Sequence, residues 1–144
     1  ADVIERREFY LTKKELQQAR KNAGSNVDVD SRLIVQYRAV KNDKAVGYAY
    51  VDGHKVRSKD ETLIFFINPR GMIEKLELLR FNEPLDYKAS ERWMRQLHGA
   101  KLNAKLSLRG DIRGITGATL TAHAQVEASR RVLALHKVVQ KRGS

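Results

Sequence analysis

The sequence predicts an α+β fold, in which helices pack on a mostly antiparallel sheet, within a single domain that spans residues 1–144. Short segments rich in β-branched and aromatic residues fill the middle of the chain, and turn-forming residues separate them. A long segment with an apolar stripe at helical spacing lies near the end. A chain of 144 residues, 42% of them hydrophobic, is long enough for one buried core and too short for two.

Residues 12–23 are predicted to form the first helix. Thr12 and Glu15 have the spacing of a capping box, in which each residue satisfies a backbone N–H of the other. Gly24 follows the last apolar position, as a glycine beyond a helix end does. The apolar face of this helix consists of Leu16, Ala19 and Ala23.

Four strands are expected next, because their residues either alternate between apolar and polar types or are almost wholly apolar. Asn42-Asp43 predicts the turn between the first two, and Asp52-Gly53 is expected to end the second. The turn Asn68-Pro69-Arg70-Gly71 predicts a hairpin between the last two. The expected strands cover residues 32–40, 45–51, 62–67 and the segment that contains Ile73, Leu76 and Leu78.

Two more helices are expected. Residues 90–97 place Trp93 and Leu97 on one side of a short helix. Residues 121–139 form the best-defined helix of the chain, whereas the weakly alternating segment 103–115 has no clear assignment. The apolar stripe of the last helix consists of Ala128, Val132, Leu135 and Val139.

Composition narrows the possible functions. The absence of cysteine excludes disulfides and thiolate metal sites in this chain, and no apolar run approaches the roughly 18 residues of a transmembrane helix. A net charge of +11 favours anionic ligands or partners. The cations are spread along the chain without a nucleic-acid-binding motif, so a solvated basic surface is the favoured interpretation. The start at Ala1-Asp2-Val3 is typical of a cleaved signal peptide, so we expect export.

One short run indicates a phosphate site. Thr116-Gly117-Ala118-Thr119-Leu120-Thr121 lies where a loop turns into the last predicted helix. Gly117 permits a tight turn, and Ala118 leaves room for close approach. The free N–H groups and the dipole of a helix N-terminus favour a phosphate there. The alternative is that Thr119 or Thr121 only caps an ordinary helix.

This run resembles the flavinylation motif of the FMN-binding domain family, which includes flavin-carrying subunits of the sodium-pumping NADH:quinone oxidoreductase and of the Rnf complex. The resemblance implies that FMN is attached through a phosphoester to the hydroxyl of Thr119. It covers residues 30–139 in the family's order. Its further segments are Val46-Gly47-Tyr48-Ala49-Tyr50, the stretch 71–76, Asn82-Glu83-Pro84 and the stretch 93–99.

The resemblance also implies a role for other residues. Glu83, Pro84 and Leu85 match an element that lies near the flavin in the family. Arg113 stands three residues before Thr116, where the family usually has aspartate, and Asp111 lies two residues earlier. Arg113 suits pairing with the phosphate of a non-covalently bound FMN. Covalent and non-covalent FMN therefore both remain open.

The expected function is electron transfer by an exported, periplasmic flavoprotein domain, rather than an enzyme with its own substrate. The resemblance implies a flavin transferase for maturation. Electron transfer also implies redox partner proteins. An acidic cytochrome is one such partner, and membrane electron-transport components that hold the domain at the membrane are another. A redox-sensing flavin domain and a basic nucleic-acid-binding module are the alternatives.

Overall fold

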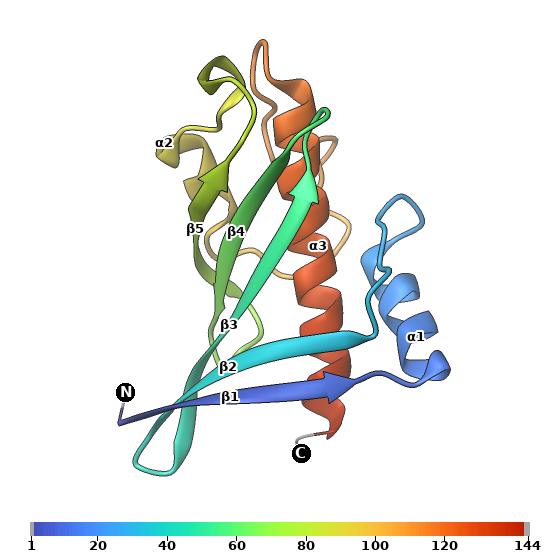
Figure 1. Cartoon of the computed structure of the whole chain (residues 1–144), viewed down its shortest axis with the longest axis vertical. Coiled ribbons are helices and arrows are strands. Elements are labelled where there is room, and N and C mark those ends of the chain that lie inside the picture. Colours follow the sequence, from blue (N-terminus) through green and yellow to red (C-terminus); the bar gives the residue numbers. More distant parts are fainter. Residues whose placement is uncertain (1, 143–144) are drawn as a thin grey trace.

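The chain is a single α+β domain, seen in a computed structural model that describes residues 2–142. Five antiparallel strands form one sheet in the order β1-β2-β3-β4-β5, and the long helix α3 runs along one side of it (Figure 1). The expected α+β class is confirmed. Ala1 and Gly143-Ser144, including the first residue used for the export expectation, lie outside the described residues.

The strands are β1 (Val3–Tyr10), β2 (Leu33–Lys41), β3 (Lys44–Lys55), β4 (Asp60–Ile67) and β5 (Ile73–Phe81). The helices are α1 (Lys13–Ala23), α2 (Glu91–Met94) and α3 (Thr119–Arg142), with single 3₁₀ turns η1 (Leu85–Tyr87) and η2 (Arg95–Leu97). The segment between η2 and α3 consists of turns and irregular chain.

The local signals at α1 and at the first hairpin are confirmed. Thr12 and Glu15 form the capping box, and the N–H of Gly24 donates to the carbonyl of Arg20 at the helix end. Asn42 and Asp43 both have positive φ, 52° and 63°, as a two-residue hairpin turn requires.

Two strand predictions need correction. Residues 3–10, for which no element is expected from the sequence, form β1. This edge strand carries as many charged as apolar side chains, so its sequence lacks the pattern of a strand. Asp52-Gly53 does not end β3, which continues to Lys55. Asp52 pairs with Leu63 of β4 and turns its carboxylate inward, where it accepts hydrogen bonds from Arg131. The buried ion pair with Arg131 thus stabilises Asp52 within the strand, although aspartate usually favours turns.

The two later helices also differ from their expected bounds. The predicted helix 90–97 is one α-helical turn, α2, followed by the 3₁₀ turn η2. The last helix begins at Thr119 and reaches Arg142, so it is longer at both ends than predicted. Its buried residues face the inner side of the sheet, where the ring of His136 lies against Tyr48 and Tyr50.

β2 and β3 separate along part of their length. They pair only between Tyr37–Lys41 and Lys44–Ala49, whereas Leu33–Gln36 pair with β1 alone. Beyond Ala49, β3 pairs with β4 alone. The two strands therefore diverge like the arms of a V (Figure 1), and a cavity of about 700 Å³ opens between them.

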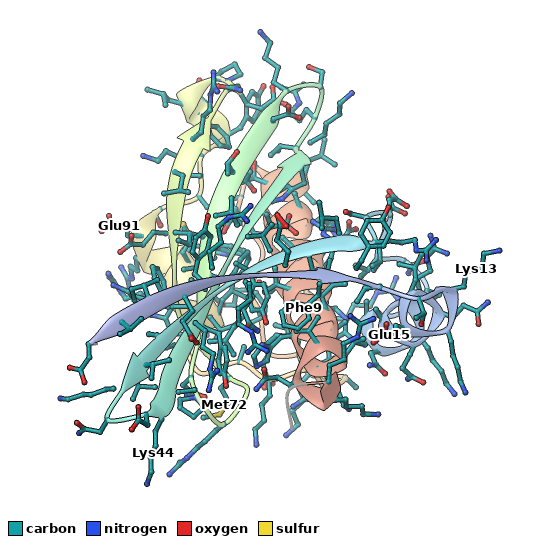
Figure 2. All side chains as sticks on the ribbon, turned by 60° about the horizontal axis from the view of Figure 1, so that its bottom comes forward. Phe9, Lys13, Glu15, Lys44, Met72 and Glu91 are labelled. Atoms are coloured by element: carbon teal, nitrogen blue, oxygen red, sulfur yellow. The ribbon has the colours of Figure 1, made fainter. Side chains whose placement is uncertain are left out.

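Charged side chains surround the molecule rather than gathering on one side. Figure 2 shows Lys13 on α1, Lys44 on the first hairpin and Glu91 on α2 at the periphery, on different sides of the fold. Phe9 of β1 instead lies toward α3 and is buried. The basic composition is thus distributed, as the sequence pattern indicates.

Candidate functional site

The predicted phosphate-binding run forms the start of α3. Gly117 has a φ of +79°, a left-handed conformation that turns the chain into the helix. The first helical hydrogen bond joins the N–H of Ala122 to the carbonyl of Ala118 at 3.2 Å. The N–H groups of Thr119, Leu120 and Thr121 precede that bond, so they have no helical partner.

The two threonines at this helix end have different environments. The Thr121 side chain is buried, and its hydroxyl donates to the carbonyl of Tyr87 at 2.5 Å. The Thr119 side chain is exposed, and its hydroxyl has no hydrogen-bond partner within residues 2–142. Neither hydroxyl accepts from the first N–H groups of α3, so neither acts as an N-cap in this conformation. Thr119 therefore combines an accessible hydroxyl with unpaired backbone donors.

Glu83 is held by the turn between β3 and β4. Its Oε2 accepts hydrogen bonds from the backbone N–H groups of Arg57, Ser58 and Lys59 at 2.8, 2.9 and 3.1 Å. Desolvation disfavours the charged form, but these three donors more than offset it and hold the pKa of Glu83 below its ordinary value. The carboxylate is thus used within the fold, and Glu83 positions Pro84 and Leu85.

Replacing Glu83 by alanine tests this positioning role. In Glu83→Ala the amides of Arg57, Ser58 and Lys59 lose their common acceptor, so their hydrogen exchange should accelerate at least about tenfold. Exchange followed residue by residue by NMR measures this. The matched control is Glu91→Ala, which removes an exposed carboxylate from α2 and should leave the three amides unchanged. Equal protection in both variants would show that the turn does not depend on Glu83.

The segment after Glu83 lies beside the start of α3. The Tyr87 carbonyl receives the Thr121 hydroxyl, and the Arg57 guanidinium lies 4.2 Å from the centroid of the Tyr87 ring. Leu85, on η1, is 76% exposed, and Leu120, on α3, is 50% exposed. The two elements joined by the Thr121 bond thus each present a solvent-exposed leucine.

Arg113 is fixed through its backbone. Its N–H donates to Oε1 of Gln96 at 2.8 Å, and its carbonyl accepts from Nε1 of Trp93 at 2.5 Å. The Arg113 guanidinium is exposed and makes no hydrogen bond or ion pair with the described part of the chain. Trp93, half-buried, therefore anchors the loop that leads to Thr116.

The exposed leucines and Thr119 lie on open surface. Cavities of about 700, 670 and 460 Å³ are lined by other residues, and none of these three includes Thr119, Leu85 or Leu120. A ligand at Thr119 therefore needs an anchor, because the surroundings enclose little of it. An ester bond or an ion pair with its phosphate supplies such an anchor.

A buried network that the sequence analysis did not identify ties α3 to the sheet. Asp52 accepts two hydrogen bonds from Arg131, at 2.7 and 2.8 Å. His54 lies between Asp52 and Glu61, 2.8 and 2.7 Å from their carboxylate oxygens. Gln125 donates to the other oxygen of Glu61 at 3.2 Å. The alternation of Tyr48, Tyr50, Asp52 and His54 along β3 is the signal that places the last two on the inner face.

The charges of this network stabilise one another. Burial alone lowers the pKa of His54, but the hydrogen bonds to Asp52 and Glu61 outweigh it and raise the pKa to about 9. Desolvation raises the pKa of Asp52, and its bonds to Arg131 and His54 bring it below the ordinary value. Because Gln125 and Arg131 belong to α3, the network fixes the helix that begins at Thr119.

Comparison with protein-family models, curated proteins and solved structures finds no match for this chain. Among residues 2–142, no helix is long and apolar enough to cross a membrane.

Proposed function

We propose that this chain is a flavoprotein domain that carries FMN on Thr119 through a phosphoester and transfers electrons between redox partners. The observation that carries the proposal is the exposed Thr119 hydroxyl at the first turn of α3, among N–H groups without helical partners. The order of the family-like segments along residues 30–139 supports it.

The residues at the site fit a phosphorylated flavin. The N–H groups of Thr119 and Leu120 and the helix dipole favour phosphate oxygens. Leu85 and Leu120 offer exposed apolar surface for the ring system. Thr116 and Gly117 keep the approach open, while Ala118, Thr121, Glu83 and Pro84 hold the surrounding backbone in place.

Attachment needs a transferase that supplies FAD. The new bond joins the Thr119 oxygen to the phosphorus of FMN. The pyrophosphate bond of FAD breaks, AMP leaves, and the hydroxyl proton is lost to solvent. When bound, the flavin supplies one- or two-electron redox chemistry, and the protein sets its access and its partners.

Non-covalent FMN is the second candidate, and Arg113 is the observation that favours it. Its guanidinium is exposed and unpaired within the described residues, three positions before Thr116. A guanidinium binds phosphate oxygens through two parallel hydrogen bonds. In this alternative Arg113 and the N–H groups at the start of α3 would hold the phosphate, and the domain suits redox sensing as well as electron transfer.

The basic surface suits an acidic redox partner, such as an exported cytochrome or a membrane electron-transport component. With a charge of +11, encounter with such a partner is faster at low salt. Electron-transfer rates with an acidic cytochrome should therefore fall as ionic strength rises. Rates independent of salt would remove this class of partner.

Intact mass and visible absorption test the proposal on protein matured in an exporting host that holds the transferase. The expected product is yellow after denaturation and heavier than the bare chain by one FMN minus one water. Thr119→Ala should be colourless and unmodified. Ser25→Ala is the control, because it removes an exposed hydroxyl from a turn outside the run 116–121 and leaves both the acceptor and the motif intact.

The other outcomes separate the candidates. Flavin released on denaturation, with binding lost in Arg113→Ala, would replace the ester by the non-covalent site. A colourless chain of unmodified mass that takes up no added FMN would exclude both flavin proposals. Salt-dependent binding of an oligonucleotide by that chain would then favour the nucleic-acid alternative.

A further inference from the structure

Arg57 is held in place at the end of the molecule where α3 begins. The turn between β3 and β4, the segment after β5 and the start of α3 lie together at the upper end in Figure 1. The backbone N–H of Arg57 donates to Oε2 of Glu83 at 2.8 Å. Its guanidinium lies over the Tyr87 ring, 4.2 Å from the centroid. Residues of the segment after β5 therefore position both the backbone and the side chain of Arg57.

The N–H donors of the Arg57 guanidinium are unused. Arg57 is exposed, and its guanidinium makes no hydrogen bond or ion pair with the described part of the chain. A guanidinium over an aromatic face is attracted to the ring electrons, and this contact occupies none of its five N–H donors. The Glu83 carboxylate, which interacts with this charge, is already bound to three backbone N–H groups of the turn. Arg57 thus presents a positioned cation whose donors are available to a ligand.

Tyr87 connects this cation to the candidate site. Its ring carries the Arg57 guanidinium, and its carbonyl accepts the hydroxyl of Thr121. Thr121 lies two residues after Thr119, in the first turn of α3. Leu85, on the same 3₁₀ turn as Tyr87, is 76% exposed. Tyr87 thus bridges the Arg57 guanidinium and the first turn of α3, and the same short turn offers exposed apolar surface.

We propose that Arg57 binds the edge of the flavin ring that becomes negative on reduction, an inference that rests on the proposed function. Two electrons from a redox partner and one proton from solvent reduce the ring; the proton goes to N5, and the negative charge lies on the N1–C2=O edge. The guanidinium offers parallel N–H donors to two neighbouring acceptors, such as N1 and the C2 oxygen. Charge near N1 is one of the means by which a protein tunes a flavin. Arg57 therefore stabilises the reduced ring and raises the potential at which the domain accepts electrons.

The reduction potential of the flavin-loaded chain tests this role of Arg57. The chain is matured in a host that holds the transferase, or loaded with added FMN. Titration with dithionite beside a reference dye gives the ratio of reduced to oxidised flavin at a fixed potential. In Arg57→Ala this ratio should fall at least about tenfold, which for a two-electron couple is a shift of about 30 mV to lower potential. The pH at which the reduced ring takes up a proton at N1 should rise, because the anion has lost its partner.

Two further variants separate an electrostatic role of Arg57 from a structural one. Arg57→Lys keeps the cation and should recover part of the shift. Lys59→Ala is the matched control, because it removes an exposed cation from the same turn, and the Lys59 N–H donates to the same oxygen of Glu83. It should leave the ratio of reduced to oxidised flavin unchanged. Arg57 is exposed, so its variants should fold, which circular dichroism checks.

The outcomes distinguish this inference from the proposed function. A flavin-bearing Arg57→Ala chain with the wild-type ratio and the wild-type N1 protonation would overturn the role of Arg57 and leave the flavin carrier in place. An equal shift in Lys59→Ala would also overturn it, because any cation of the turn would then act alike. A wild-type chain that holds no flavin in either preparation would overturn both. Intact mass separates these cases, since it reports FMN on Thr119 independently of the potential.

Discussion

Arg131→Ala is expected to lower the free energy of unfolding by about 3–5 kcal/mol. The Arg131 guanidinium makes two hydrogen bonds to Asp52, and both side chains are at most 15% exposed. Without it, the Asp52 carboxylate stays buried with His54 as its remaining charged partner. Removing one member of a buried pair leaves an uncompensated charge, which is far more destabilising than the loss of a surface ion pair.

Urea unfolding followed by circular dichroism measures this loss. Lys137→Ala is the control, because it removes an exposed cation from the same helix and should change stability by less than about 0.5 kcal/mol. The double variant Asp52→Leu, Arg131→Met removes both charges and should recover much of the loss. If Arg131→Ala unfolds like the Lys137 control, the ion pair does not hold α3 against β3.

Arg131→Ala is also expected to affect the candidate site at Thr119. Arg131 and Gln125 fix α3 on the β3–β4 hairpin, whose turn also binds Glu83. Thr119 begins that helix. If Thr119 carries FMN as proposed, Arg131→Ala should lower FMN incorporation as well, even though Arg131 lies more than three helical turns from Thr119.

The sequence predicts much of the fold because several local signals agree. The capping box at Thr12, the Asn42-Asp43 turn and the apolar stripe of α3 each depend on short-range chemistry. The first two are confirmed, and so is the stripe except at Leu135, which is only partly buried. β1 is missed because an edge strand needs little burial, so its residues need not alternate in polarity. The end of β3 is misplaced because a long-range partner, Arg131, determines whether Asp52 lies in a strand or a turn.

Only part of the candidate site can be predicted from the sequence, namely the part that depends on short-range chemistry. A glycine and two threonines before an apolar stripe indicate the start of a helix from sequence alone. The difference between Thr119 and Thr121 is not visible there, because it depends on the carbonyl of Tyr87, 34 residues earlier in the chain. The same holds for Glu83, whose three donors come from another turn. Such contacts are set by the topology of the sheet.

The second large expected effect is a loss of stability at high pH, which occurs when His54 loses its proton. Its pKa of about 9 in the folded chain lies above the ordinary value of 6.5. Because the folded state holds this proton more tightly, the stabilisation is fully present below pH 6.5 and is lost as the pH rises through about 9. The shift corresponds to roughly 3 kcal/mol. Asp52 has a lowered pKa and stays ionised throughout this range.

Urea unfolding at a series of pH values from about 6 to about 10 tests this window. The wild-type chain should lose roughly 3 kcal/mol more than His54→Gln over that range, because glutamine carries no titratable proton. His98→Gln is the control: burial, Arg95 and Lys75 hold the pKa of the exposed His98 below its ordinary value, so its titration does not account for a loss of stability as the pH rises through about 9. Parallel curves for the wild type and His54→Gln would show that the buried carboxylates do not hold a proton on His54.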